Sequence, residues 1–243
     1  MNLLKRIRTW LRLLGYRWGA APAEMRFLLE REFSGGSVLD IGAHRGEYTY
    51  WMHNHFNNGT RIVAFEPQPE LAQFLGNLKQ SFRLDRMEVA PVGLSSHSGS
   101  LPLHRPRTHW DSATVDEYTY DDADTEVFDV PVTTIDEYME AHPELRPVRF
   151  IKCDVECHEV EVLAGAKRTL SEDRPQILVE WSTPRKAYRE RMFQLAKQLG
   201  YAIFQFERGR LMPCTTAKRR TPPSWELGGN YLLLPSGAPE TIA

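Results

Sequence analysis

The sequence lacks the features that mark several specialised classes of protein. Its three cysteines are odd in number and show no paired spacing, so we expect no disulfide framework and a reducing, cytoplasmic compartment. No run approaches the ~18 apolar residues of a membrane-spanning helix, and arginines interrupt the apolar part of residues 1–20, which argues against a signal peptide. Because 30 basic residues nearly balance 32 acidic ones, we expect no nucleic-acid partner.

The composition is that of a globular protein with one main core. Hydrophobic residues make up 42% of the 243 residues and charged residues 26%. We predict an N-terminal helical extension over 1–35, a main domain over 36–236 and a tail over 237–243. Within the main domain, the stretch 95–135 predicts a β-hairpin and loop insertion, whose acidic segment 116–129 indicates a solvated loop or, alternatively, a lid.

From residue 37 on, apolar strand-like runs alternate with helical patterns. This alternation is typical of a doubly wound α/β fold, in which helices cover both faces of a mostly parallel sheet. The predicted sheet has seven strands, at 37–41, 61–65, 87–94, 149–154, 176–180, 201–206 and 231–234. The predicted helices of this domain cover 46–55, 69–81, 157–170 and 185–199, and a short one begins after Thr133 or Thr134, the expected cap.

Residues 2–18 predict a basic amphipathic helix, and a second helix is expected over 23–33. Large apolar residues recur at helical spacing, at Leu3, Leu4, Ile7, Trp10, Leu11, Leu14 and Trp18. Five basic residues and no acid accompany them, namely Lys5, Arg6, Arg8, Arg12 and Arg17. We favour a helix docked on the domain or on a partner. The alternative is peripheral contact with an anionic membrane, at its inner face, through residues 1–20.

The stretch from Val38 to Gly46 indicates a ligand site, because a buried strand turns there into a helix at two glycines. Gly42 can adopt positive φ and lets a ligand approach the backbone, while Gly46 lets the following helix pack closely. About 20 residues further on, Glu66 ends the second strand, where a carboxylate suits a ribose diol. The middle glycine of the dinucleotide motif is missing, which favours S-adenosylmethionine over NAD. The alternative is a turn without a ligand.

A second polar cluster follows strand 149–154, where Asp154, Glu156 and His158 come in succession. Ligands of open α/β sheets bind at the carboxyl ends of the strands, so we expect these side chains to line the same site. Each has an alternative: Asp154 holds only an ammonium group of the cofactor, Glu156 caps the next helix, and His158 lies on the surface.

No metal site is expected. Cys153, Cys157 and His158 contain ligand types, but their spacing matches no common zinc arrangement. Asp154 with Glu180 leaves a magnesium site as the minor alternative.

These motifs together resemble the FkbM family of SAM-dependent methyltransferases over about residues 36–235. The resemblance is carried by VLDIGAHRG at 38–46, FEP at 65–67, VTTID at 132–136, FIKCDVE at 150–156, the stretch 159–166 ending in VLAGA, and RP at 174–175 before Glu180. It implies a Rossmann-like class I methyltransferase fold, S-adenosylmethionine as cofactor, and O-methylation of a hydroxyl on a sugar, glycan or secondary metabolite. The family usually has asparagine in place of His44 and glycine in place of Cys157. A catalytically impaired binding or assembly module is therefore the alternative.

The resemblance also implies roles for single residues. It assigns Gly42, Ala43, His44 and Gly46 to the amino-acid end of the cofactor, Glu66 to its ribose and Val92 to its adenine, with Asp40 and Pro67 completing the cofactor-binding set. Asp154 is the first candidate for a catalytic residue, followed by Glu156 and His158. Glu180 and Trp181 are candidates to meet a small-molecule or glycan acceptor. No pattern predicts the oligomeric state.

Overall fold

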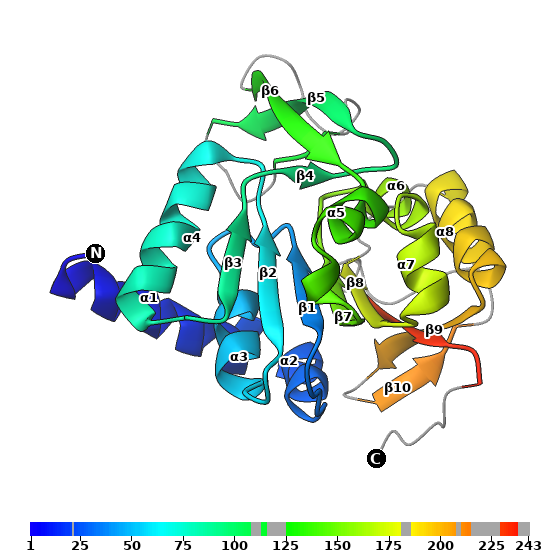
Figure 1. Ribbon diagram of the computed structural model, residues 1–243, viewed down its shortest axis with the longest axis horizontal. Coiled ribbons are helices and arrows are strands. Elements are labelled where there is room, and N and C mark those ends of the chain that lie inside the picture. The colour runs from blue at the N-terminus through cyan, green and yellow to red at the C-terminus, as the bar shows by residue number, and fades with distance from the viewer. Residues whose placement is uncertain are drawn as a thin grey trace.

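The computed structural model describes residues 1–20, 22–107, 113–115, 125–180, 186–207, 210–214 and 229–237. Residues 116–124 of the acidic segment and the candidate acceptor residue Trp181 lie outside this part of the chain. Figure 1 shows a central sheet with helices on both sides and a small second sheet above it.

Buried apolar strands form the central sheet. Among the described residues it has eight strands, in the order β10-β9-β11-β8-β7-β1-β2-β3. Five neighbours are parallel: β8 (Gln176–Glu180), β7 (Val148–Cys153), β1 (Ser37–Ile41), β2 (Arg61–Phe65) and β3 (Met87–Ala90). The antiparallel edge consists of β9 (Tyr201–Glu207), β10 (Arg210–Pro213) and β11 (Asn230–Pro235). The prediction of a mostly parallel, doubly wound sheet is confirmed, but seven strands was one too few because β10 was missed.

Alternate residues of these strands enter separate cores on the two faces of the sheet. Val38 packs with α2 (Pro22–Leu29) and α3 (Glu47–His55), and α4 (Pro69–Phe82) lies beside them. Leu39 and Ile41 enter the opposite core, covered by α5 (Ile135–Ala141), α6 (Glu159–Ala164), α7 (Lys167–Glu172) and α8 (Lys186–Gln198). None of the described helices is both long and apolar enough to cross a bilayer.

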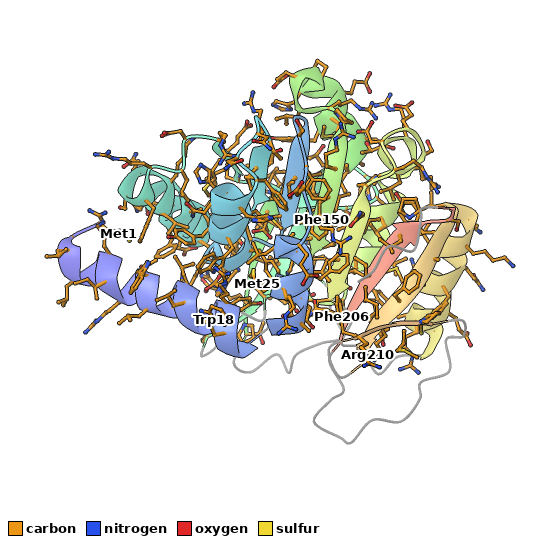
Figure 2. All side chains as sticks on the ribbon, turned by 90° about the horizontal axis from the view of Figure 1, so that it is seen from below. Met1, Trp18, Met25, Phe150, Phe206 and Arg210 are labelled. Carbon is orange, nitrogen blue, oxygen red and sulfur yellow. The ribbon has the colours of Figure 1, made fainter. Side chains whose placement is uncertain are left out.

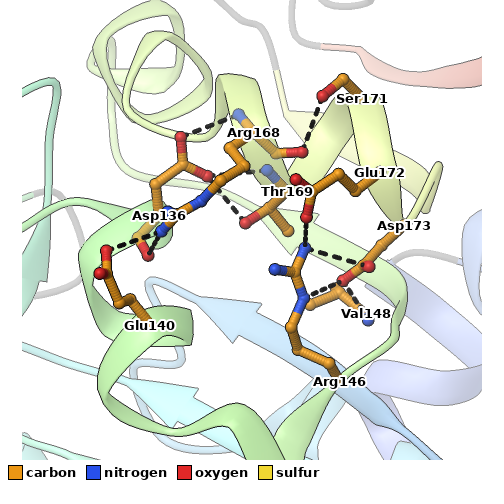
Figure 3. Close-up of polar contacts among 9 residues, drawn as sticks. All are labelled: Asp136, Glu140, Arg146, Val148, Arg168, Thr169, Ser171, Glu172 and Asp173. Carbon is orange, nitrogen blue, oxygen red and sulfur yellow. Dashed lines mark hydrogen bonds and ion pairs between the residues drawn. The ribbon is translucent and has the colours of Figure 1, made fainter.

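The helix expected over 157–170 is divided into α6 and α7 at Gly165. A Cβ at position 165 would overlap the carbonyl oxygen of Ser95. The backbone at Ser95 thus lies so close to position 165 that no residue with a side chain fits there. Asp136 then caps the new start: its carboxylate accepts hydrogen bonds from the N–H groups of Arg168 at 2.9 Å and Thr169 at 2.8 Å (Figure 3). In the same view, Asp173 pairs with Arg146 and accepts the N–H of Val148, which fixes the start of β7.

The strand expected over 87–94 also divides. After β3 the chain turns at Pro91, which has no N–H to donate to a continuing ladder. β4 (Gly93–Leu94) then pairs with β6 (Thr125–Thr133), which pairs antiparallel with β5 (Gly99–Pro106). Thr134 caps α5 by accepting the N–H of Glu137.

Arg105 holds the small sheet on α4. Its side chain is only 5% exposed and pairs with Glu70 of α4 at 3.1 Å and with Glu126 of β6 at 2.8 Å. The guanidinium also lies over the ring of Phe128, 4.8 Å from its centroid. The small sheet is therefore attached to the rim of the central sheet rather than projecting freely.

The N-terminal helix α1 (Leu3–Gly15) docks on the main domain, but not through its apolar face. Thr9 and Leu13 are buried, and the carbonyl of Leu13 accepts a hydrogen bond from the indole of Trp51 at 3.1 Å. Six large apolar side chains between residues 3 and 18 are 46–73% exposed, namely Leu3, Leu4, Ile7, Trp10, Leu11 and Trp18. The helix therefore contacts the domain, as favoured from the sequence, and leaves most of its apolar face exposed. A π-helical turn, Tyr16–Ala20, leads on to α2.

Replacing Gly165 with alanine is expected to lower the free energy of unfolding by about 1–3 kcal/mol, because the new Cβ would overlap the backbone of Ser95. Urea denaturation measures the change. Gly76→Ala is the matched control: Gly76 lies inside α4 with open space at its Cβ position, so alanine should stabilise the protein by about 0.5–1 kcal/mol. Equal effects at both positions would contradict the packing argument.

Candidate active site

A cavity of about 410 Å³ lies between the carboxyl ends of β1, β2 and β7 and the small sheet. Ten residues that the sequence analysis proposed line it: Asp40, Gly42, Ala43, His44, Glu66, Pro67, Val92, Asp154, Glu156 and His158. The insertion adds an apolar wall through Leu103, Ala113, Val115, Val130 and Val132. A volume of this size is typical of a site for a small molecule.

The two glycines of the first loop have different functions. Gly42 has φ of 74°, and a Cβ there would overlap the carbonyl oxygen of Asp154, so glycine lets the ends of β1 and β7 meet. Gly46 does not line the cavity. Its missing Cβ makes room for Leu78 and Leu75 of α4, whose methyl carbons would lie 2.6 and 2.9 Å from it. The close helix packing expected at Gly46 is therefore present, between α3 and α4.

Glu66 is buried at the end of β2 and fixes the first loop. Its carboxylate accepts the N–H of His44 at 2.9 Å and the N–H of Gln68 at 3.0 Å, one on each oxygen. Burial raises the pKa of Glu66 to about 7 despite these bonds. Each carboxylate oxygen has a second lone pair, so Glu66 can hold the loop and still accept from a ligand. His44 has φ of 48°, a conformation that asparagine adopts more readily than most residues.

A buried ion pair lies beside this loop. Lys152 of β7 is only 3% exposed at its side chain, and its ammonium contacts Asp154 at 2.6 Å. Burial alone would raise the pKa of Asp154, but the charge of Lys152 outweighs burial and lowers it. The charge of Asp154, together with burial, raises the pKa of Glu180 to about 8. Asp154 is therefore the ionised member of this carboxyl pair, and Glu180 holds its proton near neutral pH.

Asp40 is almost completely buried under the loop. Its carboxylate accepts a hydrogen bond from the hydroxyl of Thr49 on α3, and burial raises its pKa to about 6. Asp40 lines the cavity from below and joins β1 to the start of the next helix. It is thus partly a structural residue.

The loop after β7 has an unusual backbone that depends on Glu159. Glu156 and Cys157 have φ of 52° and 75°, in the left-handed region that glycine adopts most easily. The carboxylate of Glu159 accepts the N–H groups of Val155 and Cys157, both at 3.2 Å, and the hydroxyl of Tyr188 at 2.6 Å. Glu159 therefore holds the loop that precedes α6, and the left-handed backbone of Cys157 accounts for glycine as the usual residue at position 157.

His158 faces the cavity and not the surface. Its side chain is 15% exposed, Nε2 lies 2.9 Å from the hydroxyl oxygen of Ser95, and Nδ1 lies 3.9 Å from Glu161. Thr114 of the insertion donates a hydrogen bond to the carbonyl of Glu156, which places the insertion over this loop. The surface alternative for His158 is wrong.

Several lining residues were missed from the sequence. Four belong to the N-terminal segment or α3, namely Arg12, Tyr16, Glu47 and Tyr48, and three others are Gln68, Thr114 and Lys152. Strand alternation could have identified Lys152, since it lies two residues before Asp154 and shares its face. In the described part of the chain, no group of three or more His, Cys, Asp or Glu side chains is placed to hold a metal ion.

Replacing Glu159 with glutamine is expected to flatten the pH dependence of stability. Burial raises the pKa of Glu159 to about 7 from 4.5, so the folded protein binds the proton more tightly than the unfolded chain. The contribution of Glu159 to stability is therefore full below pH 4.5 and is lost as the pH rises to about 7. Urea denaturation measures the free energy of unfolding at pH 5 and at pH 8. The difference between these two values should be smaller in the variant by up to about 3 kcal/mol.

The exposed Glu30 supplies the control substitution for this measurement. Glu30→Gln should leave the difference between pH 5 and pH 8 as it is in the unmodified protein. An identical difference in Glu159→Gln would contradict the proton assignment.

Comparisons with known proteins agree with the geometry of the cavity. A family model described as the methyltransferase FkbM domain matches residues 40–203. Among solved structures, methyltransferase FkbM from Methylobacillus flagellatus is 19% identical with a TM-score of 0.52, over 86% of this chain and 46% of that one. The chain thus spans less than half the length of that protein. No curated protein matches in sequence.

Two further structures share the fold at low identity. A SAM-dependent O-methyltransferase from Thermotoga maritima is 10% identical with a TM-score of 0.50, over 91% of this chain and 67% of that one. A precorrin-6y C5,15-methyltransferase from Geobacter metallireducens is 12% identical with a TM-score of 0.50, over 88% of each chain. Because the family model covers more than half of the sequence, the chain belongs to the FkbM family of SAM-dependent methyltransferases.

Proposed function

We propose that the protein transfers a methyl group from S-adenosylmethionine to a hydroxyl of a sugar, glycan or secondary metabolite. The observation that carries this proposal is that one cavity unites the Gly42 loop, Glu66, Asp154 and His158. A cofactor site and a group able to take a proton thus lie within reach of one bound acceptor.

The residues present fit the cofactor. Gly42 lines the cavity without a side chain, and Glu66 offers carboxylate oxygens at the end of β2 for a ribose diol. Val92 and Leu94 give an apolar surface beside them for adenine. S-adenosylmethionine supplies a methyl group carried on a sulfonium ion.

Asp154 suits the ammonium group of the cofactor better than it suits proton abstraction. The charge of Lys152 lowers its pKa and keeps it ionised, and a carboxylate stabilised in this way is a weak base. We therefore assign Asp154 to the amino-acid end of the cofactor. This is the alternative role that the sequence analysis gave it, namely holding the ammonium group of the cofactor.

His158 is the side chain we assign to the acceptor proton. An imidazole is the commonest general base, and this one faces the cavity with Ser95 and Glu161 beside its two ring nitrogens. With the cofactor bound, His158 would take the proton of the acceptor hydroxyl as its oxygen gains the methyl group, and the carbon–sulfur bond of the sulfonium would break to leave a neutral thioether. The apolar wall of the insertion, including Val130 and Val132, favours an acceptor with an apolar body beside its hydroxyl.

A catalytically impaired binding module is the second candidate. It is favoured by Cys157, which holds φ of 75° where the family usually has glycine. The contacts of Glu159 with this loop weigh against it, because they hold the backbone in place with a side chain present. Methylated product in a cell extract incubated with labelled S-adenosylmethionine would dismiss this candidate.

Calorimetry is expected to detect S-adenosylmethionine binding and to show weaker binding by Glu66→Ala. Loss of a charged hydrogen bond corresponds to a dissociation constant about 10- to 100-fold higher. The product analogue lacking the ribose 2′-hydroxyl gives the sharper measurement. The unmodified protein should bind this analogue more weakly than the normal product. Glu66→Ala should bind the analogue and the normal product with equal affinity.

The exposed Glu32→Ala is the matched control and should bind like the unmodified protein. Absence of any binding by the unmodified chain would overturn the proposed function. A 2′-hydroxyl effect that persists in Glu66→Ala would overturn only the assignment of Glu66 to the ribose.

Replacing His158 with alanine is expected to lower kcat by about 10²- to 10⁴-fold, the usual contribution of a general base. Calorimetry should show unchanged affinity for S-adenosylmethionine, because His158 acts on the acceptor. The limb of the pH–rate profile that reports a base should disappear in the variant.

His97→Ala removes an exposed imidazole from the insertion at 95–135 and supplies the control. Its kcat and pH–rate profile should match those of the unmodified enzyme. If His158→Ala retained full kcat with an unchanged profile, the proton would have to pass to a different group.

A further inference from the structure

We propose that α1 and the π-helical turn after it bind an anionic lipid bilayer through an exposed apolar stripe, which we define as Leu3, Leu4, Ile7, Trp10, Leu11 and Trp18. This proposal is independent of the methyl-transfer reaction, because it concerns a surface outside the cavity. None of the stripe residues lines the cavity.

On α1, the stripe covers the side opposite the docked face and one flank. At about 100° per residue, Thr9 and Leu13 mark the docked side of α1. Positions 4, 7 and 11 lie roughly 140–180° from that side, and positions 3 and 10 lie about 80–100° from it, along its flank. The burial of Thr9 and Leu13 and the exposure of the stripe agree with this arrangement. Figure 2 shows the N-terminal segment along the outer edge of the molecule, with Met1 before α1 and Trp18 in the π-helical turn after it.

Basic side chains flank the stripe on both sides. Lys5 and Arg8 lie along one side and Arg6 lies along the other, and all three are exposed. Residues 1–20 contain no acid, whereas the rest of the chain has 25 basic and 32 acidic residues. An apolar face with aromatic residues and basic flanks is the pattern of a helix that lies in the headgroup region of an anionic membrane.

The charge distribution favours a bilayer over a second copy of the chain. A symmetric dimer through this face would bring the same basic residues of both copies together, and this repulsion opposes pairing. Anionic headgroups compensate these charges instead. The indole rings of Trp10 and Trp18 suit the same boundary, since they combine an apolar body with a polar N–H.

The docking contacts hold the stripe in a fixed orientation. Arg12 contacts Glu47 at 2.8 Å, and the guanidinium of Arg17 lies 4.5 Å from the ring centroid of Trp51. Arg12 and Tyr16, on the same segment, also line the cavity. Binding through the stripe therefore keeps the cavity within about one helix diameter, roughly 10 Å, of the bilayer surface.

Vesicle flotation tests the proposal with the full chain. The probes are vesicles of phosphatidylcholine alone and of phosphatidylcholine with phosphatidylglycerol, each at low and high salt. The protein should float with the anionic vesicles at least about tenfold more than with the neutral ones, and high salt should reduce the difference.

Two pairs of variants make the test specific. Trp10→Ala with Trp18→Ala removes the aromatic part of the stripe, and Val127→Ala with Met212→Ala is the matched control, since those apolar side chains are exposed elsewhere. Lys5→Glu with Arg8→Glu reverses the flanking charge, and Lys167→Glu with Lys197→Glu makes the same change on α7 and α8. Calorimetry with S-adenosylmethionine checks that each variant remains folded.

Both α1 variants should lose at least about tenfold in flotation while both controls float normally. The proposal is overturned if the unmodified protein does not float with anionic vesicles, or if the α1 variants float as the controls do. Sedimentation showing a dimer that the tryptophan variant abolishes, without flotation, would assign the stripe to a second copy and equally overturn it. Normal cofactor binding without flotation would leave the proposed function intact.

Discussion

The buried ammonium group of Lys152 organises the charges beneath the cavity. It pairs directly with Asp154, and the carboxyl groups of Asp40 and Glu180 lie near enough to raise its pKa although burial alone would lower it. One cation thus stabilises a region that contains three acids. Without it, the charge of Asp154, whose side chain is 23% exposed, would lack its compensating cation. The ionised state of Asp154 therefore depends on a residue whose side chain solvent scarcely reaches.

Local sequence patterns predicted the central strands well and the junctions poorly. The bounds of β1, β2 and β8 agree with the predictions because each is a short apolar run next to turn residues or charges. The division at Gly165 depends on the approach of Ser95, some 70 residues earlier in the chain, and periodicity has no access to it. The orientation of α1 could not be predicted for a related reason: amphipathicity shows that a helix has an apolar face, but not which face the domain covers.

The residues of the site also fall into those that sequence patterns predict and those that they miss. Gly42, Glu66, Asp154 and His158 follow directly from strand ends and turn glycines, because parallel strands bring their carboxyl ends to one edge. The role of Glu159 could not be predicted, since it depends on Tyr188 and on two backbone N–H groups that the fold brings to its carboxylate. Sequence patterns thus identify which residues reach the cavity. Tertiary packing decides which of them face its interior and which hold its loops in place.

Arg12 and Tyr16 line the cavity although they precede the family match, which begins at residue 40. The wall they form is therefore not part of the region that defines the family. Substitutions in this segment can reshape the cavity while the glycine loop and the strand ends stay constant. A fragment limited to the matched region would lack this wall of the cavity and also β11, the strand that lies between β8 and β9 in the central sheet.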